Sequence, residues 1–129
     1  MDSVFDEEIL ERLREAIGPA DLAALLRELS QEIRSQHSAL RSGWDARKLE
    51  SVRVVAHGLK GCVGTLGAMS MSNLCRTLEA AAASHDAARV GELLEPLEAA
   101  ARACIAESFS RAAAEEQTAC RTAGVVGGR

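Results

Sequence analysis

The segment from Ala46 to Leu66 repeats apolar residues at alternating steps of three and four positions, and this period constrains the fold more than any other feature. Its apolar positions are Leu49, Val52, Ala56, Leu59, Val63 and Leu66. An α-helix brings residues at these steps onto one face. A seam this regular is typical of a helix that packs between neighbours in a bundle.

Four other segments show the same period and predict helices over 4–16, 19–41, 70–83 and 86–109. The first carries an apolar stripe made of Val4, Phe5, Ile9, Leu13 and Ile17, and the last is expected to turn Phe109 inward. The connections between the helices are short, which predicts antiparallel neighbours. We therefore expect an all-α fold, an antiparallel up-down four-helix bundle with a short extra N-terminal helix.

The predicted helix ends follow from local sequence signals. Asp45, Ser70 and Asp86 are expected to be N-caps, because their side-chain oxygens can accept hydrogen bonds from the first turn. Gly67 is expected to stop the 46–66 helix, and Pro96 to kink or open the last one. The glycine-rich end predicts a flexible tail over 119–129, after a bundle domain over 1–118.

Composition excludes several classes of function. Aromatic residues make up 2% of the 129 residues and the net charge is −4, so neither a basic stripe nor stacking aromatics point to nucleic acid. No apolar run is long enough to span a membrane. The start "MDSVFDEEIL" is acidic and lacks the apolar core of a signal peptide, which predicts a cytoplasmic protein.

The cysteines predict neither a disulfide framework nor a metal site. There are four of them, with no CxxC pair and no histidine at a zinc-finger interval. In a cytoplasmic chain such residues act as small apolar side chains. We expect no metal ion and no cofactor on this chain.

His57 stands out when the 46–66 helix is drawn at about 100° per residue. The histidine lies about 130° from the centre of the apolar seam, so it faces out of the bundle. Gly61 and Gly64 follow at i+4 and i+7 on the same outward side, and Lys60 lies beside them. Val54 is expected to be exposed one turn before the histidine.

Glycine in a helix interior costs about 1 kcal/mol relative to alanine, which suggests a compensating use. A surface histidine by itself is usually just solvated. Here the missing side chains at 61 and 64 would leave an open notch beside the imidazole, and Lys60 would supply a positive charge. Those are the needs of a histidine that accepts a phosphoryl group. Gly58 has no role that the pattern explains, and His37 and His85 lack such surroundings, so both are expected to be solvent-exposed.

The stretch "AHGLKGCVGTLGA", residues 56–68, resembles the signature of histidine-containing phosphotransfer (HPt) domains, and "LCRTLE", residues 74–79, is similar to the next helix of that family. The resemblance implies an antiparallel four-helix bundle. It also implies that His57 is the phosphorylated residue, that Lys60 stabilises the phosphohistidine, and that Gly61 and Gly64 leave room for a partner.

The resemblance further implies a phosphocarrier that relays phosphate without drawing it from ATP, since no nucleotide-binding loop is present. The expected partners are response-regulator receiver domains and a hybrid sensor histidine kinase, with Mg²⁺ on the receiver. Nucleic acid and membrane are not expected partners, and the protein is expected to be a monomer. A docking face would include Arg53 and Val54, with an apolar edge from Ile9 or Leu13.

Two other functions remain open from the sequence. A non-catalytic helical adaptor would bind a signalling partner through the same face without phosphate transfer. A phosphotransfer module of a chemotaxis kinase would use the same chemistry but take its phosphate from a kinase ATP domain.

Overall fold

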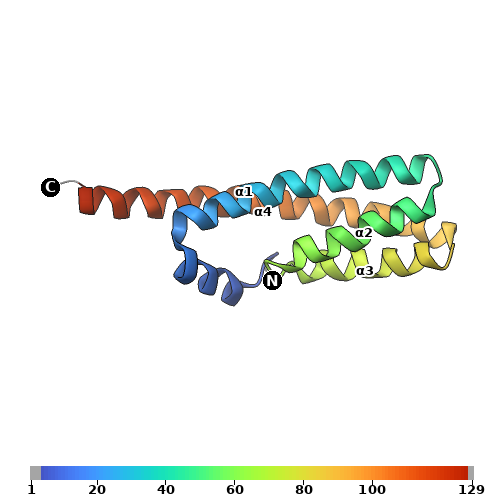
Figure 1. Ribbon diagram of the computed structural model, residues 1–129, viewed down its shortest axis with the longest axis horizontal. Helices are drawn as coiled ribbons and strands as arrows, with labels where there is room; N and C mark the ends of the chain where they lie inside the picture. The colour runs from blue at the N-terminus through green and yellow to red at the C-terminus, as the bar shows by residue number, and fades with distance from the viewer. Residues whose placement is uncertain (1–3, 128–129) are drawn as a thin grey trace.

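The structure is a computed structural model that describes the backbone of residues 4–127 and the side chains of residues 4–122. Over that range it contains four helices and no strand. They are α1 (Glu7–Asp45), α2 (Leu49–Gly64), α3 (Met69–Ala83) and α4 (Ala87–Gly127). Helix α1 packs on α4 and α2, and α3 packs on α2 and α4, so the four helices close into a ring of neighbours (Figure 1). This arrangement confirms the predicted up-down four-helix bundle.

Helix α1 consists of two helical stretches joined at Gly18, where φ is 87° and ψ is 161°. Glycine adopts such a positive φ without steric cost, and Pro19 suits the first turn of the stretch that follows. The chain bends at this point, and residues 4–17, which we call the N-terminal arm, lie apart from the rest of α1 (Figure 1). The arm confirms the predicted extra helix, although its helical part begins at Glu7, after a side-chain cap by Asp6.

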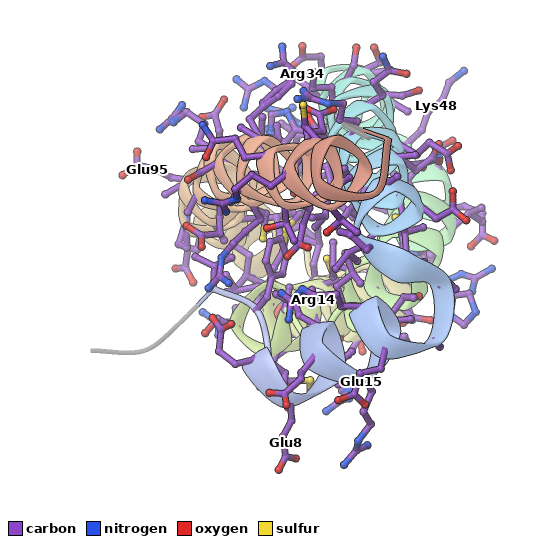
Figure 2. All side chains as sticks on the ribbon, turned by 90° about the vertical axis from the view of Figure 1, so that its left-hand side faces the viewer. Glu8, Arg14, Glu15, Arg34, Lys48 and Glu95 are labelled. Atoms are coloured by element: carbon purple, nitrogen blue, oxygen red, sulfur yellow. The ribbon has the colours of Figure 1, made fainter. Side chains whose placement is uncertain are left out.

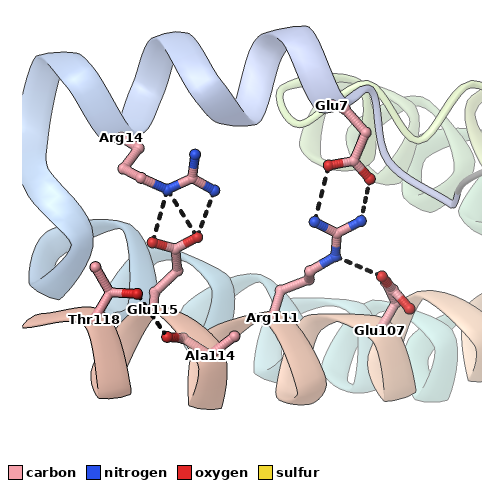
Figure 3. Close-up of polar contacts among 7 residues, drawn as sticks. All are labelled: Glu7, Arg14, Glu107, Arg111, Ala114, Glu115 and Thr118. Atoms are coloured by element: carbon pink, nitrogen blue, oxygen red, sulfur yellow. Dashed lines mark hydrogen bonds and ion pairs between the residues drawn. The ribbon is translucent and has the colours of Figure 1, made fainter.

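Ion pairs hold the N-terminal arm against α4 (Figure 3). Arg14 donates to the buried carboxylate of Glu115 from Nε at 2.9 Å and from Nη2 at 2.6 Å. Arg111 of α4 pairs with Glu7 of the arm. In the end-on view of Figure 2, Arg14 points between the arm and α4, whereas Glu15 points away from the fold. Two-pronged pairs of this kind fix orientation as well as charge.

The arm also contacts the turn between α2 and α3, at Gly67. This residue has φ 74°, and a Cβ placed on it would overlap the Cβ of Asp6. The Gly67 amide donates to the Gly64 carbonyl at 3.0 Å and the Ala68 amide to the Val63 carbonyl at 3.1 Å, which closes the end of α2. The predicted glycine stop is confirmed, and its lack of a side chain makes room for the arm.

Two of the predicted N-caps are wrong and one is confirmed. Asp45 is the last residue of α1, and α2 begins only after a turn in which Arg47 has φ 55°. Ser70 lies inside the first turn of α3. Backbone hydrogen bonds across these tight turns close the helix ends, so no side-chain cap is needed there. Asp86 does cap α4, since its Oδ1 accepts from the Arg89 amide at 3.1 Å.

The core is aliphatic, and the seam of α2 contributes to it as predicted. Val52, Leu59 and Val63 are fully buried. Burying three side chains of this size stabilises the fold by about 5–9 kcal/mol, whereas three glycines in one helix cost about 3 kcal/mol. Tertiary packing of the inner face therefore outweighs the poor helix propensity of the outer face.

Helix α4 is longer than predicted. It runs through Pro96 as a single helix and continues to Gly127, so the expected interruption at the proline does not divide it. Leu93 and Leu97 are buried on either side of Pro96 and fix the helix there. The helix enters the segment 119–129, for which the sequence predicts a flexible tail; residues 128–129 lie outside the described residues, and the boundary at 118 stays a prediction.

Three large apolar residues near helix surfaces refine the expected core. Ile17 and Phe109, both predicted to face inward, are 40% and 41% exposed. The Phe109 ring lies beneath the guanidinium groups of Arg27 and Arg34, which cover it through cation–π contacts. Trp44, near the end of α1, is half-buried, and the Arg47 guanidinium lies over its ring. Within residues 4–127, no helix combines the length and the apolar character that a membrane span requires.

Candidate functional site

The outward face of α2 carries the predicted residues in the predicted orientation. The His57 side chain is 65% exposed, Gly61 is exposed, and Lys60 and Gly64 are half-buried at the side of the same face. Val54 is exposed, as expected. The 3.6-residue period alone was enough to place these positions, because a helix of this length leaves little freedom in where its apolar seam must point.

The structure adds one residue that the sequence reasoning missed, Glu79 of α3. Its Oε2 lies 2.8 Å from His57 Nδ1, and its Oε1 accepts from Lys60 Nζ at 2.9 Å. One carboxylate thus joins the histidine and the lysine. A signal existed in the sequence: α2 and α3 form an antiparallel pair that turns at Gly67, so positions near 77 must lie opposite His57.

Glu79 fixes the tautomer of the imidazole. An ionised carboxylate only accepts hydrogen bonds, so the neutral ring must carry its proton on Nδ1. The lone pair is then on Nε2, the nitrogen that Glu79 does not contact. An exposed imidazole held in this state presents a nucleophilic nitrogen to solvent.

The hydrogen bond from Lys60, helped by the one from His57, holds the pKa of Glu79 below its ordinary value of 4.5. Because the folded-state pKa is lowered, the cluster stabilises the fold fully above about pH 4.5, and the contribution is lost as the pH falls through the lower folded value. We expect the Glu79 carboxyl, followed by NMR, to titrate below 4.5 in the wild type and closer to 4.5 in Lys60→Met. Equal midpoints in the two proteins would contradict the pairing.

The glycines of this face serve no packing purpose within the chain. A Cβ added at Gly58 or at Gly61 would meet no atom within 4 Å, and one at Gly64 would make an ordinary contact at 3.8 Å with Ser72. These are also helical positions at which alanine would be more stable. The space at Gly61 is therefore open beside His57, whereas Gly64 is half-buried next to Ser72. Gly58 still has no role that the fold explains.

The predicted docking residues are not all brought to this face. Arg53 lies next to it, held by Glu50 through hydrogen bonds of 3.0 and 2.5 Å. Ile9 and Leu13 belong to the N-terminal arm, which contacts the chain at Gly67. That glycine follows His57 by ten positions, or about 15 Å along a helix axis. Their part in docking stays a prediction.

The remaining candidates form no second site. Cys75 and Cys104 are buried, and burial raises the pKa of their thiols to about 12 and about 11, as expected of small apolar side chains. His85 is exposed, but His37 is half-buried, with Nε2 4.0 Å from a Glu98 oxygen. In the part of the chain that is described, no group of His, Cys, Asp and Glu is arranged to hold a metal ion.

The molecule is an all-helical bundle with an exposed histidine, a lysine one turn away, and a carboxylate hydrogen-bonded to the imidazole. These features define a class of protein, and comparison with known families identifies the same class. The chain belongs to the Hpt domain family, whose model matches residues 24–115. It is a histidine phosphotransfer protein. In the comparison with curated proteins, none matches this chain significantly.

Among solved structures, the chain is similar to histidine-containing phosphotransfer protein B (HptB) from Pseudomonas aeruginosa PAO1. The TM-score is 0.81 at 20% sequence identity, over 87% of this chain and 96% of that one. At this identity the likeness concerns the fold.

Proposed function

We propose that this protein relays a phosphoryl group between the aspartates of receiver domains, with His57 as the phosphorylated residue. The observation that carries the proposal is the shared carboxylate of Glu79, which orients the exposed His57 and holds Lys60 beside it. A histidine with no function at a surface would not need two neighbours arranged around it. His57 and Lys60, which this carboxylate brings together, both belong to the stretch that resembles the family signature.

The transfer step balances with the groups at hand. The lone pair of His57 Nε2 attacks the phosphorus of an aspartyl phosphate on the receiver. The new N–P bond forms as the P–O bond to the aspartate breaks, and the aspartate leaves as a carboxylate. The ring gains positive character, and the Nδ1 proton stays hydrogen-bonded to Glu79, which offsets that charge. The reverse steps deliver the phosphoryl group to a second receiver.

Lys60 has the second role in this mechanism. A phosphoryl group adds close to two negative charges, and the Lys60 ammonium lies one turn from the ring that carries it. Glu79 holds this ammonium in place before transfer. Gly61 and Gly64 leave space for the receiver to bring its aspartate close to Nε2. The receiver supplies its own acidic pocket and Mg²⁺, and a hybrid sensor kinase is the proposed source of the phosphate.

The test is phosphate transfer from a panel of purified receiver domains that have been phosphorylated with a radiolabelled small donor. We expect label to move to this protein within the panel and to be lost in acid but retained in base, as N-linked phosphate behaves. Binding of a receiver without any movement of label would support the helical adaptor instead. Label accepted only from a kinase ATP domain would support the chemotaxis-type module.

The glycines give a separate prediction. We expect Gly58→Ala and Gly61→Ala each to raise the free energy of unfolding by up to about 1 kcal/mol, since both positions are helical with open space around them. Gly61→Leu is expected to slow transfer about tenfold or more by blocking the approach to His57, because a clash at the centre of an interface costs well over 1 kcal/mol. Denaturant unfolding and transfer rates measure the two effects.

The matched control is Gly58→Ala, which should gain the same stability and transfer normally. If Gly61→Leu transferred at the wild-type rate, Gly61 would not provide clearance for the partner.

A further inference from the structure

A groove lies between α1 and α2 on the side of the site opposite Glu79. Its volume is about 270 Å³. The groove has apolar walls made by Leu25 and Leu29 of α1 and by Leu66, just after the end of α2. Cys62 of α2 adds its thiol. Burial and the nearby Glu32 carboxylate raise the pKa of that thiol, so it stays neutral and apolar. The lining is that of a socket for an aliphatic chain.

Two carboxylates stand at the rim of this groove, Glu28 and Glu32 of α1, four positions apart on one helix face. Within the described side chains, neither has an ion-pair partner; Glu32 accepts a hydrogen bond from Gln36 at 2.7 Å. The neighbouring Arg27 is occupied, since it pairs with Glu116 of α4 at 2.6 Å. Like charges at this spacing destabilise a helix, and among the described side chains no cation pairs with either carboxylate.

The groove lies within reach of a partner that docks on His57. Thr65 lines the groove and donates from Oγ1 to the Gly61 carbonyl at 3.1 Å, so the groove begins one turn beyond the open notch. Cys62 is five positions after His57, about 7.5 Å along the helix axis. A standard interface covers about 800 Å² on each partner, a patch about 16 Å in radius. Cys62 is also turned about 140° around the helix from His57, so a receiver centred on His57 reaches the groove at the edge of its interface.

We propose that this groove selects the receiver by taking a lysine or arginine side chain from it, an inference that rests on the proposed function. The methylene stem of that residue lies on Leu25, Leu29 and Leu66, and its cationic head pairs with Glu28 and Glu32. Long basic side chains combine an apolar stem with a charged tip in this way, and an apolar floor below two unpaired carboxylates complements both parts. A neutral apolar side chain would leave the two carboxylates without a cationic partner.

The test compares Glu28→Gln/Glu32→Gln with the wild type, using the receiver of the panel that transfers phosphate fastest. We expect the double variant to lower the second-order rate of transfer about five- to tenfold at low ionic strength, with a weaker dependence on salt. Leu25→Ala removes part of the apolar floor without altering charge. It should weaken receiver binding about threefold to fivefold and leave the salt dependence unchanged.

The matched control is Glu11→Gln/Glu15→Gln, which neutralises another exposed pair four positions apart, on the N-terminal arm. It should stay within about twofold of the wild type at every salt concentration. Wild-type behaviour of Leu25→Ala, or equal behaviour of the two double variants, would overturn the proposal.

Phosphorylation by phosphoramidate, a small donor that needs no docking, separates this proposal from the proposed function. The Glu28→Gln/Glu32→Gln variant should label on His57 like the wild type. If the wild type itself accepts no phosphate from phosphoramidate or from any receiver, the proposed function fails and the groove proposal fails with it. If the wild type labels normally and the double variant accepts phosphate from the receiver at the wild-type rate, only the groove proposal fails.

Discussion

The His57→Gln variant is expected to accept no phosphoryl group from any phosphorylated receiver domain. A glutamine amide nitrogen has no available lone pair and cannot replace Nε2 as a nucleophile. The side chain is mostly exposed, so the change should alter the free energy of unfolding by no more than about 0.5 kcal/mol. The measurement is label on the protein after incubation with a phosphorylated receiver, together with a denaturation curve that verifies folding.

The control for this variant is His85→Asn. His85 is an exposed histidine in a turn, with φ 58°, and asparagine tolerates that backbone conformation. This variant should accept phosphate at the wild-type rate. Acid-labile label on His57→Gln would show that another residue is phosphorylated. Receiver binding by His57→Gln with unchanged affinity is expected, since docking and chemistry use different groups.

The Glu79→Ala variant is expected to transfer phosphate about ten- to a hundredfold more slowly, the range seen when a carboxylate that orients a functional histidine is removed from a metal site. Without Glu79, the imidazole loses the acceptor that keeps its proton on Nδ1, and Lys60 loses the contact that holds it near the ring. Glu79→Gln should transfer phosphate at a rate between those of the wild type and Glu79→Ala. Its amide oxygen can still accept from Nδ1, while its amide nitrogen faces Lys60.

Nitrogen NMR of the His57 ring distinguishes positioning from a general loss of structure. The wild type should show the proton on Nδ1, and Glu79→Ala a mixture of the two tautomers. Glu50→Ala is the matched control, since Glu50 forms its ion pair with Arg53 on the same helix, away from the His57 ring. It should change neither the tautomer nor the transfer rate. A wild-type tautomer and rate in Glu79→Ala would remove Glu79 from the mechanism.

Much of the site could be predicted from the sequence because it depends on one helix. The seam from Leu49 to Leu66 defines which way α2 faces, and a period of 3.6 residues then places His57, Lys60 and Gly61 on the outer side. The presence of the helices could be predicted for the same reason, because it depends on apolar spacing within single segments. The helix ends were harder to predict. Asp45 and Ser70 have the right chemistry for N-caps, yet backbone hydrogen bonds close the tight turns there, so no side-chain cap is needed.

Residues that act across helices could not be placed in this way. Gly91 illustrates the difficulty, because a Cβ there would lie 3.1 Å from the Trp44 ring, a contact set by how α1 meets α4. Phe109 shows the reverse case, an apolar residue on the helical period that the neighbouring Arg27 and Arg34 cover at the surface.

Spacing along one chain segment is enough to predict the helical class, the outward direction of His57 and the run of glycines beside it. Three features could be seen once the helices were placed in space: Glu79 joins His57 to Lys60, the arm lies against α4 through Arg14 and Glu115, and Glu28 and Glu32 border a groove. These features join separate helices. Their distances depend on the register and packing of whole helices, which no local period specifies.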